Sequence, residues 1–430
     1  MTLNTLTKIL APLAAPALLL SCSGQVAQEP AMQASESPAF SNAVNDPPPG
    51  WNGHVFRLSH NYPASLPAPP ESGFPWKQYD FKTQPSEYIY SVLNYARADL
   101  EGVDWDPLAL SQPNWFHSPW MAYGDDASNA REFVQGMTKE RSSRAGELSP
   151  QQTTPFISNY AVGLYNDVGG WTFGKVWQDP ESPQLAAGAP NFSDGAMAIK
   201  LLFTQADPEV PADGVPFLEG SKTWQANVAP FSSSNPQPRS PKTLRLLQVD
   251  IAVRDARNDD LTGWLFGTFV YNNDAPGRTP LDKLVPVGLM WGDSPGFLPA
   301  QANAGANPPE QWINESIGLY QHYGWAKRIN GPVDNPASSC ISCHGGSAET
   351  PVTSNMIPPT NLPDAQKLPW FTNIKSGQAK DPGSISLDFS LQMSVAVQNW
   401  SKWNIAKSGM SQARETNATS EFTVTRGDDD

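Results

Sequence analysis

The sequence predicts an α+β fold, with a central antiparallel β-sheet, flanking helices, long proline-rich loops and a motif-bearing C-terminal segment. Helical periodicity near residues 85–100 and 388–407 predicts a helix towards each end of the chain. Between about residues 155 and 295, apolar and polar residues alternate with the period of β-strands. Proline accounts for 43 of the 430 residues, about twice the average frequency, and this favours many loops.

Four consecutive parts are expected along the chain. Residues 1–22 read as an export signal that ends at a cysteine. Residues 23–50 are rich in Ala, Ser, Gln and Pro without apolar periodicity, which predicts a disordered linker. Residues 51–405 form the globular body, and residues 406–430 are expected to be a disordered acidic tail.

The first 22 residues resemble a bacterial lipoprotein signal. Lys8 precedes an apolar stretch from Ile9 to Leu20 that is too short for a comfortable membrane span. Leu19-Leu20-Ser21-Cys22 resembles a lipobox, which implies cleavage before Cys22 and acylation of that residue. The residue after the cysteine is Ser23 and not Asp, which in lipoproteins of this kind implies sorting to the outer membrane. We therefore expect a periplasmic, lipid-anchored protein; the alternative is an ordinary secretory signal.

Three helices are expected. The first runs from Pro85 to about Leu100, since proline suits the first helical position. The second is predicted from Ser128 to about Arg141. The third, capped by Asp388, is expected to reach about Lys407.

The strands are expected between these helices. Residues 162–165 and 171–177 flank Gly169-Gly170, which predicts a hairpin, and residues 196–204 and 284–291 read as further strands.

The clearest strand is the stretch from Leu247 to Arg254. Its apolar residues occupy every second position and polar or small residues fill the others, which is the period of a half-buried strand. A turn at residues 258–260 leads to residues 264–271, its expected antiparallel partner.

Cys340-Ile341-Ser342-Cys343-His344 has the Cys-x-x-Cys-His form that attaches haem c, and it lies in the segment at about residues 320–405. Two thiols at this spacing can each form a thioether with one haem vinyl group. The adjacent His344 then serves as the proximal iron ligand. With one such motif, we expect one covalent haem c, packed against the preceding sheet.

Two other uses of this cysteine pair are open. Cys340 and Cys343 have the spacing of a redox dithiol or disulfide. They also have the spacing of half a zinc site, but His344 is too close to Cys343 for both to bind one ion easily. Cys22 is the only other cysteine in the chain.

The sixth iron position decides between electron transfer and ligand chemistry. Met356 is the nearest candidate, 12 residues after His344, and its alternative role is to fill the loop. Met393 is expected in the core, and His322 is expected to be a satisfied or exposed histidine.

Basic side chains are needed to bind haem propionates. Lys327-Arg328, Arg131, Arg141 and Arg144 are candidates, and a solvated surface charge is the alternative for each.

The formal charge is −14, which argues against nucleic acid or anionic lipid as a main partner. An acidic surface is compatible with a basic redox partner protein of unknown identity.

Several segments together resemble a group of exported bacterial cytochrome c family proteins, over most of residues 51–405. The segments are Arg131-Glu132-Phe133, Glu140-Arg141-Ser142-Ser143-Arg144, residues 245–255, residues 330–344 and Ser386-Leu387-Asp388. The resemblance implies haem ligation through Cys340, Cys343 and His344, and electron transfer.

A shorter likeness is to β-sheet cytochromes c-prime and their hydroxylamine-oxidising relatives with a lysine-crosslinked haem. It rests on Asp194-Gly195 before a strand with Lys200, on Gly263-Trp264 and on the late haem motif. It implies a five-coordinate iron under an aromatic lid.

The leading hypothesis is a membrane-tethered monohaem c-type cytochrome that transfers single electrons in the periplasm. The alternative is a five-coordinate haem c enzyme or sensor for peroxide, nitric oxide or a small nitrogen compound. A third is a dithiol module on a structural lipoprotein.

Overall fold

The computed structural model describes residues 40, 44–45, 49–121, 133–134, 137–186, 188–228, 240–352 and 355–407. These residues belong to one compact unit. The expected signal with Cys22, most of the linker, and the tail from residue 408 onwards lie outside them. Among the described residues, every helix is too short or too polar to span a bilayer.

An 11-stranded sheet dominates the described residues, in the order β1-β3-β4-β7-β8-β10-β11-β12-β13, with β2 beside β7 and β9 beside β10. All its pairs are antiparallel except β1 with β3. The predicted α+β class is confirmed. The strands are Val44–Asn45 (β1), Trp115–Phe116 (β2), Phe133–Val134 (β3), Met137–Lys139 (β4), Asn159–Asn166 (β7), Met197–Thr204 (β8), Thr223–Val228 (β9), Ser240–Arg254 (β10), Trp264–Tyr271 (β11), Leu284–Met290 (β12) and Gln311–Ile313 (β13).

Two small two-stranded sheets accompany the large one. They pair Ser143–Arg144 (β5) with Phe156–Ile157 (β6), and Glu349–Thr350 (β14) with Ile385–Ser386 (β15). The α-helices are Pro85–Leu100 (α1), Asp167–Val176 (α2), Pro299–Asn303 (α3), Cys340–Ser347 (α4), Asp364–Lys367 (α5) and Leu391–Lys407 (α6). Short 3₁₀ helices occupy Pro75–Gln78, Glu101–Val103, Pro107–Ala109, Pro211–Asp213, Pro216–Leu218, Ala256–Asn258, Pro280–Lys283, Trp325–Lys327 and Leu368–Trp370.

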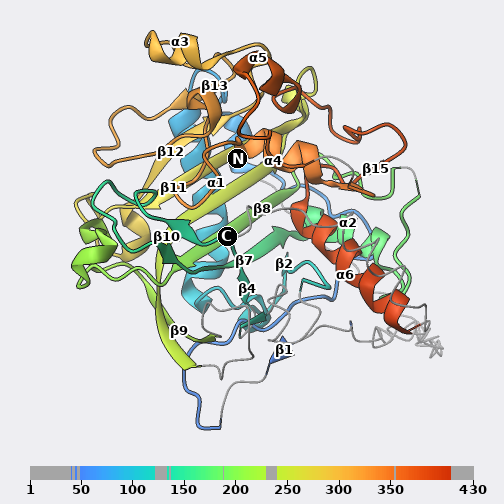
Figure 1. The fold of residues 1–430 in the computed structure, drawn as a ribbon. Helices are drawn as coiled ribbons and strands as arrows, with labels where there is room; N and C mark the ends of the chain where they lie inside the picture. Colours follow the sequence, from blue (N-terminus) through green and yellow to red (C-terminus); the bar gives the residue numbers. More distant parts are fainter. Residues whose placement is uncertain are drawn as a thin grey trace, which may run out of the picture. The chain divides into compact units, whose positions relative to one another are not determined.

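Helix α1 covers one face of the sheet, and α4 and α6 lie over the other (Figure 1). The bounds of α1 match the prediction, with Pro85 in its first turn. Its Ile89 side chain lies over Gly267 of β11, where a Cβ atom would come within 2.5 Å of Ile89 Cδ1. A glycine in the strand therefore lets the helix approach the sheet closely.

Strand β10 confirms the alternation expected between Leu247 and Arg254, and it pairs with β11 in the expected antiparallel register. Val249 and Ile251 are buried in the core as predicted. The other face is not open to solvent, however, because Gln248 is also fully buried. The polar side of β10 is therefore covered by protein, and it forms part of the site described below.

The hairpin expected around Gly169-Gly170 is wrong. Strand β7 ends at Asn166, whose side chain accepts a hydrogen bond from Gly169 N and so caps helix α2. A Cβ atom at Gly170 would come within 2.4 Å of the Phe116 ring. The glycines therefore allow α2 to pack on β2 and do not form a turn.

The prediction of a helix from Ser128 to Arg141 is also wrong for those of its residues that the structure describes. Residues 133–134 and 137–139 are the strands β3 and β4, and β4 pairs with β7 through Thr138 opposite Ala161. Pairing with a sheet edge has overridden a helical pattern in sequence. The remaining residues from 128 to 136 lie outside the described part.

The terminal helix is confirmed, but its predicted cap is wrong. Helix α6 begins at Leu391, and Asp388 lies before it with a left-handed backbone. Met393 is fully buried, as expected for a core residue.

Candidate haem site

The cysteine motif forms the first turns of helix α4. Ser339 is the N-cap: its Oγ accepts from Ser342 N at 2.9 Å, and Ser342 Oγ accepts from Ser339 N at 2.8 Å. This reciprocal pair fixes where the helix starts. Cys340 and Cys343 are one helical turn apart, so their thiols lie on the same side, with His344 next to them.

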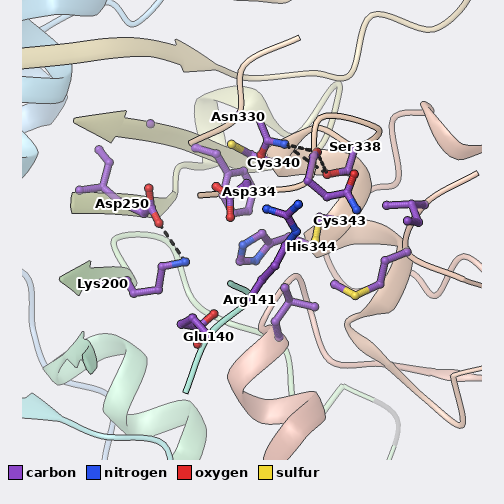
Figure 2. A pocket seen from close by; sticks show the side chains of 17 residues that line it. Glu140, Arg141, Lys200, Asp250, Asn330, Asp334, Ser338, Cys340, Cys343 and His344 are labelled. Atoms are coloured by element: carbon purple, nitrogen blue, oxygen red, sulfur yellow. Dashed lines mark hydrogen bonds and ion pairs between the residues drawn. The ribbon is translucent and has the colours of Figure 1, made fainter. Parts of the chain in front are cut away.

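The motif borders a cavity whose lining residues come from the sheet, from the segment that carries the motif and from the start of α6. One wall is the sheet face carrying Lys200, Asp250 and Phe266, and the opposite wall is the haem motif (Figure 2). Strands far apart in sequence thus complete the site that the motif begins.

The His344 ring is oriented as a metal-binding imidazole should be. Its Nδ1 lies 2.9 Å from the carbonyl oxygen of Phe389, and a carbonyl only accepts, so Nδ1 carries the hydrogen. In the neutral ring, Nε2 then holds the free lone pair, and the ring is directed into the cavity (Figure 2). Burial lowers the pKa of His344, which favours this neutral form, although the Phe389 carbonyl acts in the other direction.

Burial affects the reactivity of the Cys340 thiol. Cys340 and Cys343 are not joined in a disulfide. Burial raises the pKa of the Cys340 thiol well above its usual value, and the negative charge of Asp334 adds to the effect. The thiolate is the form that attacks a disulfide, so the raised pKa of Cys340 works against a redox dithiol. Among the described residues, moreover, no three His, Cys, Asp or Glu side chains are grouped to hold a metal ion.

A charged cluster forms the sheet side of the cavity. Lys200 Nζ lies 2.9 Å from Asp250 Oδ2 across the β8–β10 pair. Burial alone would lower the pKa of Lys200, but the charges of Asp250, Asp334 and Glu140 outweigh it and raise the pKa. Lys200 therefore stays protonated beside the space that His344 faces.

Gln248 ties this cluster to the haem segment. Its Nε2 donates to Asp250 Oδ1 at 2.7 Å and lies 3.4 Å from Asp334 Oδ2. Its Oε1 accepts from Val333 N at 3.3 Å. The buried polar face of β10 thus holds the chain just before the motif.

Met356 lines the cavity together with His344, so the structure brings the expected distal candidate to the site. Arg141 also lines it, with its guanidinium bound to the Glu147 carboxylate at 2.6 and 2.8 Å and to Val333 O at 3.1 Å. Of the described basic residues that were candidates for propionates, Arg141 is therefore the one that reaches the cavity.

The other basic candidates are elsewhere. Arg328 is fully buried and donates to the backbone carbonyls of Asp293, Ser294, Trp325 and Phe297, so it supports a loop. Arg144 is exposed, and Arg131 lies outside the described residues. His322 is neither exposed nor fully satisfied: its Nε2 lies 2.7 Å from Pro332 O, but its buried Nδ1 has no hydrogen-bond partner in the structure.

Sequence reasoning missed most of the sheet wall. The alternation in residues 247–254 places Asp250 among the polar positions of a half-buried strand, and Lys200 is noted only through the likeness to β-sheet cytochromes c-prime. The signal that could have revealed this wall is a pair of opposite charges, Lys200 and Asp250, at facing positions of two adjacent strands. That signal needs the strand register, which the sequence alone does not supply.

Comparison of the chain with protein-family models, with curated proteins and with solved structures gave no match.

Proposed function

We propose that this chain is a monohaem c-type cytochrome, with one haem attached through Cys340 and Cys343 and His344 as the proximal ligand. The observation that carries the proposal is the orientation of His344: its Nδ1 donates to Phe389 O, which leaves Nε2 for a metal inside a cavity bordered by both thiols. A hydrogen bond of this kind from the second nitrogen is typical of metal-binding histidines.

Attachment would use the thiols in their neutral form. Each S–H adds across one vinyl C=C bond, so that one C–S and one C–H bond form and no oxidant is consumed. The raised pKa of Cys340 is compatible with this role. Arg141 would lie near the propionates, and Phe266, whose ring centre is 4.7 Å from that of His344, would shield the proximal side.

The proposed role is single-electron transfer in the periplasm, with the protein tethered to the outer membrane through Cys22. A bound haem c supplies a one-electron Fe(III)/Fe(II) couple. Met356 at the cavity supports a closed, electron-transferring iron. The acidic surface would suit a basic redox partner.

One observation favours a second candidate, a five-coordinate haem enzyme or sensor. The Lys200–Asp250 pair offers a protonated donor beside the cavity. Distal hydrogen-bond donors and polarity govern how a haem binds and activates small ligands. Peroxide, nitric oxide or a small nitrogen compound would be the ligand class.

The decisive experiment is expression with c-type maturation factors, followed by pyridine haemochrome analysis and haem staining after denaturation. We expect one covalent haem in the native chain. The Cys340→Ala, Cys343→Ala double variant should lose it, whereas Cys22→Ala, which removes the remaining cysteine, should keep it. Absence of covalent haem from the native chain would overturn the proposal.

The two candidate roles differ in their optical spectra. A six-coordinate, low-spin spectrum that does not respond to carbon monoxide would support electron transfer. A high-spin spectrum that shifts with carbon monoxide would support the enzyme or sensor.

A further inference from the structure

The loop before α6 contains a fully buried carboxylate with three donors. Asp388 Oδ1 accepts from Trp264 Nε1 at 3.0 Å and from Gly377 N at 3.1 Å. Its Oδ2 accepts from Phe192 N at 2.7 Å. Three hydrogen bonds thus hold this carboxyl group, and Lys175 is near enough to interact with it electrostatically. Such an arrangement costs free energy unless the donors are well placed.

The backbone at this point is unusual. Asp388 has φ +48° and Phe389 has φ +65°, so two successive residues that are not glycine adopt left-handed conformations. Each such residue carries a cost of about 1 kcal/mol or more. The surrounding hydrogen bonds must hold the loop in this shape, and the Asp388 carboxylate receives three of them.

The strained loop presents one group to the haem motif. The carbonyl of Phe389 accepts from His344 Nδ1 at 2.9 Å. The Phe389 side chain is fixed as well, because its ring packs against Phe266 and Trp264 with centroids 5.9 and 6.3 Å apart. At Gly345, on α4, an added Cβ atom would come within 2.9 Å of the Phe389 ring. The carbonyl is thus held between the sheet and α4.

We propose that Asp388 is the positioning residue for His344: by fixing the Asp388–Phe389 backbone, it holds the carbonyl that orients the imidazole and sets its basicity. This inference rests on the proposed haem function. A stronger hydrogen bond from Nδ1 makes Nε2 a better donor to Fe(III), which lowers the reduction potential. Asp388 acts through Phe389 and does not touch the metal site.

The test is Asp388→Asn in the haem-loaded, full-length protein. The amide presents an N–H towards one of the three donors, so at least one hydrogen bond is lost and the Phe389 carbonyl is released. Exchange of the His344 Nδ1 proton, followed by NMR in the reduced protein, should accelerate roughly tenfold. The Fe(III)/Fe(II) equilibrium should shift about tenfold towards Fe(II), an increase of about 59 mV for a one-electron couple.

Asp388→Asn also removes a negative charge, so a second variant separates charge from position. Trp264→Phe removes one donor and keeps the carboxylate, and it should change proton exchange and potential in the same direction. If Asp388→Asn does not fold, Trp264→Phe tests the proposal in its place. The matched control is Tyr165→Phe, which breaks the 2.7 Å hydrogen bond to Ser390 Oγ beside the same loop and should leave both readouts unchanged.

The outcomes separate this inference from the proposed function. If the native chain carries no haem, the function itself fails. If the native chain is loaded but Asp388→Asn and Trp264→Phe both leave the His344 proton exchange at its native rate, Asp388 is only a structural residue. A changed potential with unchanged exchange would mean that its charge acts directly, and this also overturns the positioning role.

Discussion

Burial determines which form each reactive side chain takes at the candidate site. It lowers the pKa of His344 and raises that of Cys340, so the imidazole and the thiol are both favoured in their neutral forms. Lys200 differs because the neighbouring carboxylates Asp250, Asp334 and Glu140 outweigh its burial. A neutral imidazole and a neutral thiol thus lie beside a retained positive charge.

Met356 provides the first test at this scale. It is the methionine that lines the cavity, so Met356→Ala is expected to convert a low-spin, six-coordinate spectrum into a five-coordinate one that binds carbon monoxide. Loss of a thioether ligand should also lower the reduction potential. Met393→Leu is the control, since Met393 is buried in α6 and a swap of similar volume costs less than about 1.5 kcal/mol. An unchanged spectrum in Met356→Ala would exclude it as ligand.

Asp293 provides a pH-dependent test. It is fully buried, it accepts from Ser339 Oγ at 2.6 Å, and burial raises its pKa from 3.8 to about 7 despite the nearby Arg328. The folded state therefore retains a proton that the unfolded state loses. The resulting stability is fully present below about pH 3.8 and is lost as the pH rises through about 7.

The measurement is the free energy of unfolding against pH for the native chain and for Asp293→Asn, which cannot titrate. Between pH 3.8 and 7, the native value should fall relative to the variant by up to about 1.4 kcal/mol per pH unit. Burial also raises the pKa of Glu349 to about 7, but Glu349 is present in both proteins and cancels in the difference. Parallel profiles would show that Asp293 stays ionised.

At the scale of elements, helix α4 depends on its first turn. Ser339 Oγ accepts from Ser342 N and also donates to Asp293 Oδ1, so one hydroxyl joins the helix to the loop after β12. Ser339→Ala should lower the free energy of unfolding by about 1–3 kcal/mol. Chemical denaturation measures this, and Ser339→Thr, which keeps an oxygen at the same position, should recover most of the loss. Equal losses in both variants would contradict the capping role.

Elements with strict local periodicity could be predicted from the sequence, and elements defined by their partners could not. The alternation in β10 and the proline at the start of α1 are local signals, and both elements occur where expected. Gly169-Gly170 is typical of a turn in sequence. The reason for a glycine in α2 is the nearby Phe116 ring, and the sequence does not show that this ring lies there. Strands β3 and β4 are only 2 and 3 residues long, and their pairing defines them.

The same division applies to the site. The Cys340–His344 motif is contiguous, so the sequence alone could predict that its two thiols and its imidazole lie together. The sheet wall needs the register that places Lys200 beside Asp250, and the support of His344 needs the fold that brings Phe389 to it. Contacts between residues 45 or more positions apart leave no pattern in a single sequence.

At the scale of the whole molecule, the central sheet is covered on both faces and serves as a wall of the site. Helix α1 lies over one face, and the haem segment with α6 lies over the other (Figure 1). The cavity is lined by residues from Glu140 to Leu391, so its walls come from distant parts of the described sequence.

The last prediction concerns where this body is held. If Cys22 is the acylated N-terminus, Cys22→Ala should move the mature protein from the membrane to the soluble periplasmic fraction without loss of covalent haem, because a lipid anchor acts through its acyl chains. Ser23→Asp is the matched variant: it keeps the anchor but should move the protein from the outer to the inner membrane. Fractionation followed by haem staining measures both changes. Retention of a Cys22→Ala chain that has lost its signal, as judged by its mass, would contradict the lipid anchor.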